Sequence, residues 1–293
     1  MNAATRRAFA PWMLIAPSFA LAVFIIAYPF FDIARMSVYH VSRFGILGSF
    51  AGLANFRRIF ADPVFIATIW RTLVWTGTVV GGTILVSLPV SLVLNENFHG
   101  QGLARTLVML PWSVSLTMSA IVWLWSFDAN HGMVNATLQS IGVLHQPVQW
   151  MARASTAFPI EILVGILVSV PFVVTIFLGG LSSIPSDIYE AARIDGAGRV
   201  QQFWRLTLPL LRPFISLAVV LNVIYVFNSF PIIWVMTQGG PAEGTQILVT
   251  YLYELAFRLG RPGEAAAVSL AMLAILMVFT TIYVRMQMRS AEP

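Results

Sequence analysis

The chain contains no cysteine and no lysine. The absence of cysteine excludes disulfide bonds and thiol chemistry. The absence of lysine excludes a phosphate-binding loop of the Walker A type, which needs its lysine to reach the nucleotide phosphates, and it also excludes Schiff-base chemistry. If ATP drives this protein, the hydrolysis therefore has to take place on a separate chain.

Charged residues are also scarce. Only 10% of the 293 residues are charged and 58% are hydrophobic, with a mean hydropathy of +0.81. Because an ordinary soluble domain carries about 25% charged residues, we expect an integral membrane protein. The net charge of +5 is spread over short segments without a basic run, so the sequence does not indicate binding to nucleic acid.

Six apolar stretches are each long enough to cross a bilayer as a helix, which takes about 20 residues. We expect an all-α membrane protein with a single transmembrane domain over residues 1–293. Its spans are expected at about residues 11–34, 68–94, 106–127, 159–180, 213–236 and 264–285. The first stretch is too long for the core of a signal peptide. Between spans we expect a short helix near residues 55–60 and an amphipathic helix over residues 247–259.

The arginines barely decide which side of the membrane the termini occupy. With both termini in the cytoplasm, the cytoplasmic set would be Arg6, Arg7, Arg105, Arg193, Arg199, Arg205, Arg212, Arg285 and Arg289. The outer set would be Arg35, Arg43, Arg57, Arg58, Arg71, Arg153, Arg258 and Arg261. The positive-inside rule therefore favours cytoplasmic termini only slightly.

A polar segment, residues 181–212, separates the fourth and fifth expected spans. We expect a helix capped by Ser186 and ended by Gly196 and Gly198, then two further turns over residues 201–206 that Pro209 stops. The segment also carries apolar side chains among its charges, namely Tyr189, Ile194, Phe203 and Trp204. Such a surface fits either a docking site for another protein or a loop lying on lipid headgroups.

The stretch from Glu190 to Pro209 resembles the EAA loop of permease subunits from binding-protein-dependent ABC importers. Glu190, Ala191, Ala192, Gly196, Leu208 and Pro209 match that loop, whereas Leu206 stands where the family usually has isoleucine. In this family the loop forms a coupling helix that sits in a cleft of the cytoplasmic ATPase. The resemblance implies that the coupling residues here are Tyr189, Glu190, Ala191, Ala192, Ile194, Asp195, Gly196, Leu208 and Pro209.

Two outer segments resemble the carbohydrate branch of these permeases, of the maltose or glycerol-phosphate type. They are T-Q-G-G-P from Thr237 with the aromatic residues that follow it, and Gly52-Leu53-x-Asn55 with Asp62-Pro63. The resemblance implies a transport subunit, not an enzyme, in the bacterial cytoplasmic membrane with both termini inside. The implied partners are a second permease, an ATPase dimer that holds ATP and magnesium, an external solute-binding protein and membrane lipid. No cofactor is expected on this chain.

The fifth expected span is the most polar. Asn222, Tyr225 and Ser229 fall within about 60° of one another on a helix, and Asn228 lies to one side. These groups suit the hydroxyls of a sugar, but they equally suit hydrogen bonds between helices. No carboxylate or arginine falls in the middle of a span, because Asp32, Arg71, Glu161, Glu264 and Arg285 all lie near expected span ends. This pattern argues against a carrier coupled to protons or sodium.

We therefore expect a subunit that moves a sugar or related polyol by alternating access, driven by ATP. Neutral sugars, oligosaccharides, polyols and a phosphorylated polyol all remain open as solutes. The alternatives are a passive channel or ion-coupled carrier, and a membrane scaffold without transport. The four histidines, His40, His99, His131 and His145, lack the spacing of metal ligands, so we expect no metal site.

Overall fold

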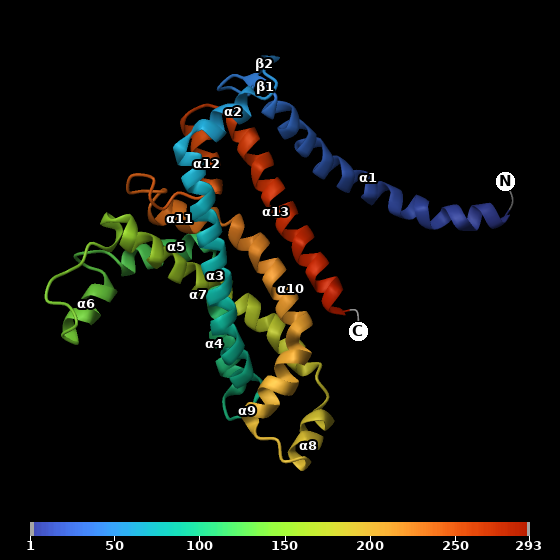
Figure 1. Ribbon diagram of the computed structural model, residues 1–293, viewed down its shortest axis with the longest axis vertical. Helices are drawn as coiled ribbons and strands as arrows, with labels where there is room; N and C mark the ends of the chain where they lie inside the picture. The colour runs from blue at the N-terminus through green and yellow to red at the C-terminus, as the bar shows by residue number, and fades with distance from the viewer. Residues whose placement is uncertain (1–2, 292–293) are drawn as a thin grey trace. The chain divides into compact units, whose positions relative to one another are not determined.

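The computed structural model describes residues 3–291, and Figure 1 shows that these residues are mostly helical. The α-helices are α1 (Ala3–Ser37), α2 (Ala54–Ala61), α3 (Pro63–Asn95), α4 (Gln101–Ser113), α5 (Leu116–Ser126), α6 (Met133–Ser140), α7 (Ala154–Ser182), α8 (Ser186–Ile194), α9 (Arg199–Gln202), α10 (Leu208–Phe227), α11 (Phe230–Met236), α12 (Leu248–Tyr253) and α13 (Pro262–Ala291). Two π-helical turns, Phe203–Thr207 and Glu254–Arg258, and a 3-10 turn, Trp150–Ala152, interrupt them. The strands are β1 (Tyr39–Val41) and β2 (Leu47–Phe50).

The prediction of an all-α membrane protein is confirmed. Among the described residues, five helices are long and apolar enough to span a membrane, and there are six such elements if α4 and α5 count as one span. The third expected span is not continuous, because α4 and α5 meet at a bend of 96°. Val114 is extended at that point, and the hydroxyl of Ser115 caps α5 by accepting a hydrogen bond from the Met118 amide.

The fifth expected span also differs from its prediction. A continuous helix runs from Arg199 to Phe227, and Pro209 lies in the first turn of α10 without stopping it. The π-helical turn just before Pro209 widens the helix and makes room for the proline ring. The helix instead breaks at Asn228 and Ser229, where Ser229 is extended, and α11 follows as a separate short helix.

The contacts divide the chain into two units, of which the first comprises residues 1–63 and 252–277. In this unit the sequence-predicted short helix is confirmed as α2, whereas the antiparallel pair β1–β2 was not predicted. Asn55 is buried, and its amide nitrogen donates to the carbonyls of Ser37 and Tyr39, both at 2.9 Å. Glu264 forms ion pairs with Arg58 at 3.5 Å and with Arg261 at 3.6 Å.

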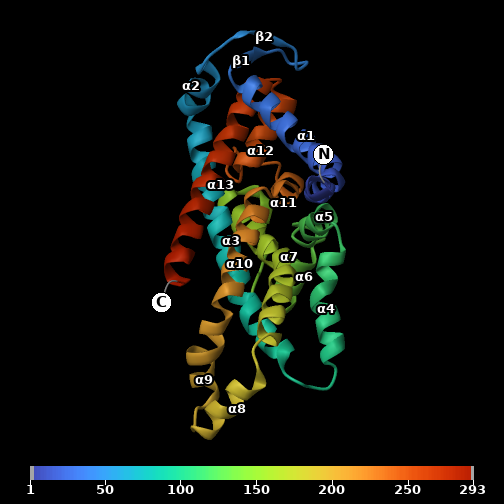
Figure 2. The same cartoon turned by 90° about the vertical axis from the view of Figure 1, so that its right-hand side faces the viewer.

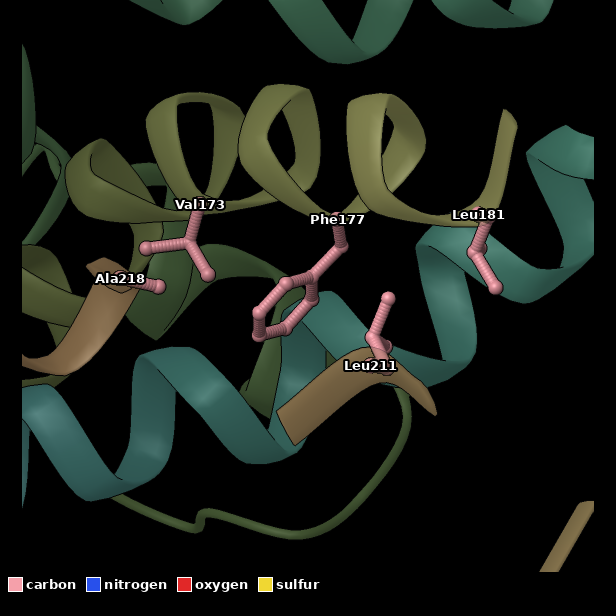
Figure 3. Packing of buried hydrophobic residues seen from close by; sticks show 5 residues of the cluster. All are labelled: Val173, Phe177, Leu181, Leu211 and Ala218. Carbon is pink, nitrogen blue, oxygen red and sulfur yellow. The ribbon is translucent and has the colours of Figure 1, made fainter. Parts of the chain in front are cut away.

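The second unit comprises residues 64–251 and 278–293, and its core lies between α3, α7 and α10. Figure 3 shows Val173, Phe177 and Leu181 of α7 directed toward Leu211 and Ala218 of α10. The two helices approach so closely at Gly180 that a β-carbon there would lie 2.6 Å from the Phe214 ring. This contact joins the helix before the polar segment to the helix after it.

Candidate functional site

The polar segment folds into a helical hairpin, α8–α9, at one end of the second unit (Figure 2). Helix α8 ends at Ile194, and Gly196 follows in the left-handed region with a φ of 80°, as its sequence predicted. The Gly196 and Ala197 amides donate to the carbonyls of Arg193 and Ala192, at 3.0 and 2.8 Å. The predicted cap was wrong, because Pro185 precedes the helix and Ser186 is already its first residue.

Two polar side chains close the hairpin from within. The buried Gln202 donates its side-chain amide to the Ala197 carbonyl at 2.8 Å, which fixes the turn between α8 and α9. The Tyr189 hydroxyl lies 3.0 Å from the buried Thr207 hydroxyl. Tyr189 therefore ties α8 to the π-helical turn, although the sequence suggested that it belongs to the outward surface.

The hairpin and the π-helical turn after it expose several apolar side chains. Ile194 is 87% exposed, Val200 73% and Trp204 62%, and Ala191 lies exposed among them. We call these four residues the hairpin face. Of the other predicted coupling residues, Glu190, Asp195 and Gly196 are exposed, whereas Ala192, Leu208 and Pro209 are half-buried. Large apolar side chains exposed on a polar segment indicate a surface that another protein covers.

A cleft of about 730 Å³ adjoins the hairpin. One side of it is lined by Asn95, the last residue of α3, and by Glu96 and Asn97, which follow it. The other side is lined by charged residues of the hairpin, namely Glu190, Arg193 and Arg199. Because charges of both signs meet here, the cleft suits a polar side chain from a docked partner.

A second cavity, of about 320 Å³, lies between α4, α7 and α10. Its lining residues are Trp112, Val168, Ser169, Phe172, Leu221, Asn222, Ile224 and Tyr225. The structure thus brings together Asn222 and Tyr225 from the set found in the sequence. Asn228 instead donates its side-chain amide to the Ile224 carbonyl at 2.9 Å, and Ser229 lies beyond the end of α10; neither lines the cavity.

Two of the aromatic residues around this cavity, Trp112 and Phe172, escaped the sequence analysis. Trp112 and Phe172 lie with ring centroids 5.9 Å apart, on α4 and α7. In the sequence, Pro111 next to Trp112 indicated only that the helix is irregular there. The packing of α4 on α7 is what places Trp112 in the same cavity as Asn222. The Asn222 side chain is fully buried, and neither its oxygen nor its nitrogen has a hydrogen-bond partner. A buried amide in this state lacks the partners that buried polar groups normally have, and a bound solute or water molecule would supply them.

A third cavity, of about 770 Å³, lies at the end of α5. Trp125, Trp150 and Asp128 are among its lining residues. The backbone amides of His131 and Asn130 donate to the Asp128 carboxylate at 2.8 and 3.0 Å, and these bonds hold its pKa below the usual value. Within residues 3–291, no group of three or more His, Asp or Glu side chains is placed to hold a metal ion.

A bundle of spanning helices with a cavity inside it and an exposed hairpin at one end defines a membrane transport subunit. The chain belongs to the family of binding-protein-dependent transport system inner membrane components, whose pattern matches residues 83–291. The matched range includes the hairpin and the cavity around Asn222. Family membership identifies the chain as a membrane component of the transport system and not as a catalytic subunit.

Relatives match along nearly the whole chain. A probable ABC transporter permease protein of Brucella suis biovar 1 is 56% identical over 282 residues, which cover 96% of this chain and 98% of that protein. The sn-glycerol-3-phosphate transport system permease protein of Yersinia pestis is 30% identical and covers 94% of this chain and 92% of its own. The trehalose/maltose transport system permease protein of Thermococcus litoralis is 30% identical and covers 96% and 94%.

Solved structures show the same fold. A bacterial ABC transporter involved in the import of the acidic polysaccharide alginate superposes with a TM-score of 0.85. The match covers 98% of both chains at 23% sequence identity. A chain of the methionine ABC transporter in an inward-facing conformation gives a TM-score of 0.55, with 76% of this chain and 94% of that chain covered at 18% identity.

Proposed function

We propose that the chain is a transmembrane subunit of an ATP-driven importer that moves a neutral sugar or related polyol by alternating access. The observation that carries this proposal is the hairpin face, which exposes Ile194, Val200 and Trp204 at the end of rigidly packed spans. A surface of this kind suits a cytoplasmic ATPase on a separate chain, which would bind the ATP and magnesium. Docking on the hairpin requires both termini to lie in the cytoplasm.

The cavity around Asn222 supports an uncharged solute. None of its lining residues carries a charge, and the aromatic rings of Trp112, Phe172 and Tyr225 offer flat apolar surfaces. Sugar rings combine such faces with hydroxyls that hydrogen-bond to an amide like that of Asn222. A phosphorylated polyol would lack a positive partner among the residues that line this cavity. Trehalose or maltose, the solutes named for one relative, therefore suits this cavity better than sn-glycerol-3-phosphate, the solute named for another.

The remaining partners follow from the family and the relatives. A binding-protein-dependent system needs an external solute-binding protein. The cavity is lined by three helices only, α4, α7 and α10, so a second permease would supply the rest of the pathway wall. The chain itself would need no cofactor. A passive channel does not require a docking surface for an ATPase, and a scaffold does not require a solute cavity. The presence of both features therefore favours the importer.

The decisive experiment replaces Ile194 with aspartate. Because Ile194 is 87% exposed, Ile194→Asp should leave insertion and folding unchanged. We expect the ATPase to be lost when the tagged permease is purified from its native membrane, and solute-stimulated ATP hydrolysis to fall at least about tenfold, as one disrupted apolar contact can cause.

The matched control is Ile141→Asp, since Ile141 is 65% exposed in the segment between α6 and the 3-10 turn. This variant should keep both the ATPase and the stimulated hydrolysis. Retention of the ATPase by Ile194→Asp, or release of the ATPase by both variants, would contradict docking on the hairpin face.

A further inference from the structure

The cavity of about 770 Å³ at the end of α5, which we call the outer cavity, lies outside the sites that the proposed function uses. Its lining residues Trp150, Met151 and Ala152 come just before α7, which begins at Ala154 and ends at Ser182 ahead of the hairpin. Helix α7 has 29 residues and is therefore about 43 Å long, enough to cross a bilayer. The outer cavity and the hairpin thus lie at opposite ends of one spanning helix.

Two indole rings line the outer cavity. Trp125 lies in the last turn of α5 and is 72% exposed. Trp150 is half-buried, and its indole nitrogen donates to the Asn135 side-chain oxygen at 2.9 Å. Its ring also packs edge-on against Phe127, with ring centroids 6.0 Å apart. These contacts fix the orientation of the Trp150 ring before any ligand arrives.

Asn135 is itself held firmly in place. It is buried, and its amide nitrogen donates to the carbonyls of Ala129 and Val148 at 2.9 and 3.0 Å. Its oxygen accepts a further hydrogen bond from the Val148 amide at 3.3 Å. The wall of the outer cavity that carries Trp150 is therefore rigid.

Polar groups of the outer cavity are open to a ligand. The Asp128 Oδ1 atom accepts from the backbone amides of His131 and Asn130, which keep the pKa of this carboxyl low and the group ionised at neutral pH. The Nδ1 atom of His131 lies 3.6 Å from the same oxygen. Within residues 3–291, no group hydrogen-bonds to Asp128 Oδ2 or to the side-chain amide of the exposed Gln149.

This combination of groups suits a saccharide. The apolar faces of a sugar ring stack on indoles, and its hydroxyls donate to a carboxylate and exchange hydrogen bonds with an amide. A volume of about 770 Å³ is within the usual range of small-molecule sites and accommodates two or more sugar rings. The lining contains an ionised carboxylate and no arginine, so it disfavours an anionic solute.

Aromatic rings beside a carboxylate also suit a quaternary ammonium ion. Such an ion needs a compact cage, and it has no hydrogen atom to donate to Asp128 and no acceptor for the Gln149 amide. The size of the outer cavity and its two open polar side chains therefore favour a ligand with hydroxyl groups.

We propose that the outer cavity is a second binding site, for a neutral disaccharide or short oligosaccharide, separate from the cavity around Asn222. Trp125 and Trp150 supply the stacking surfaces, and Asp128 and Gln149 bind the hydroxyls. The site would hold the solute at the end of the spans where it enters an importer. Only this assignment to the outer side depends on the proposed function, through the cytoplasmic position of the hairpin.

The test measures binding of maltose and trehalose by saturation-transfer NMR. The protein carries Asn222→Leu, so that the other cavity lacks its amide, and it is purified with any subunits that copurify. The detergent must have no sugar headgroup, because a maltoside would compete with the probes. We expect saturable binding of at least one disaccharide with a Kd in the millimolar range or below, without competition from choline chloride at equal concentration.

Two further substitutions locate the binding. Trp125→Ala removes an exposed ring and should weaken binding at least about tenfold. Asp128→Asn keeps an oxygen for the two backbone amides but loses the charge, and it should weaken binding about fivefold. The matched control is Trp70→Ala, since Trp70 on α3 is 67% exposed and does not line the outer cavity; it should leave Kd unchanged.

The absence of saturable binding of both disaccharides overturns the proposal. So does binding that Trp125→Ala and Asp128→Asn leave unchanged, or binding that choline displaces. Because Kd is measured without ATP hydrolysis, a failure of docking on the hairpin face would not change it. The two proposals therefore fail separately.

Discussion

Asn222 and Asn135 show how the same residue type serves two purposes in this protein. Both side chains are buried. Asn135 is fully used: its amide nitrogen donates to the carbonyls of Ala129 and Val148 at 2.9 and 3.0 Å, and its oxygen accepts from the Trp150 indole at 2.9 Å. Asn222 has no protein partner at either atom. Asn135 therefore stabilises the fold, whereas the unpaired amide of Asn222 costs stability, which agrees with the proposal that a solute binds it.

Replacement by leucine separates these two roles. Because Asn222→Leu removes an unpaired polar group, we expect Tm to stay unchanged or to rise by up to about 4 °C. Uptake of the neutral sugar or polyol that the wild-type protein transports should fall at least about tenfold, since the solute loses its amide partner.

Asn135→Leu should instead destabilise the protein and lower Tm by about 4 °C or more, because it leaves the buried donors that Asn135 accepts from without a partner. Uptake assays in membrane vesicles and thermal unfolding of the purified protein measure the two effects. Normal uptake by Asn222→Leu would show that the cavity around it is not the solute pathway.

At the scale of elements, the α8–α9 hairpin owes its shape to one backbone conformation. Gly196 has a φ of 80°, and a β-carbon there would meet no atom within 4 Å. The need for glycine is therefore conformational and not steric. Left-handed backbone costs other L-residues about 1–2 kcal/mol, with asparagine among the residues that tolerate it best. The turn orients Ile194 on one arm of the hairpin relative to Val200 on the other.

Substitutions at Gly196 should follow this order of tolerance. We expect Gly196→Val to lower solute-stimulated ATP hydrolysis by about tenfold, because the strained turn reorients the hairpin face. Gly196→Asn should retain most of the stimulation, and both variants should insert into the membrane normally. Hydrolysis by the purified assembly in lipid, with and without solute and binding protein, is the measurement. Equal activity of the valine variant and the wild type would exclude a role for this turn.

At the scale of the whole molecule, α7 and α10 connect the two candidate sites within the second unit. Ser169 and Phe172 of α7 line the cavity together with Asn222 of α10. About two turns further along, Phe177 packs against Leu211 beside the hairpin (Figure 3). Close-packed helices move as rigid bodies, so a displacement of the hairpin would be transmitted to the cavity.

Neighbouring glycines of α7 test this packing. A β-carbon on Gly180 would lie 2.6 Å from the Phe214 ring, whereas one on Gly179 would meet no atom within 4 Å. We expect Gly180→Val to lower Tm by about 4 °C or more through overpacking, and to uncouple ATP hydrolysis from uptake. Gly179→Val should change neither by a measurable amount, and identical effects of the two substitutions would argue against the close contact.

Much of this architecture was accessible from local patterns. Apolar stretches located the spans, and Gly196 marked the turn of the hairpin. The breaks were harder, because Pro209 was expected to stop a helix and instead lies inside one, whereas Ser115 and Asn228 mark real interruptions. A π-helical turn and a cap depend on hydrogen bonds over several residues, which composition alone does not reveal. Trp112 was missed because its importance depends on the position of α4 against α7.

The sequence by itself determined the class of the protein: apolar stretches of sufficient length require spanning helices, and the residues around Glu190 resemble the coupling loop of ABC importer permeases. Only the tertiary structure decided which polar groups are left without partners. Asn222 and Glu161 are a single amide and a single carboxylate in apolar surroundings, and nothing local distinguishes them from Asn135 or Glu264. Whether a buried polar atom is satisfied depends on groups far along the chain, such as Thr237 opposite Glu161. That dependence on distant partners is the physical reason why the unpaired atoms of these two side chains are visible only after folding.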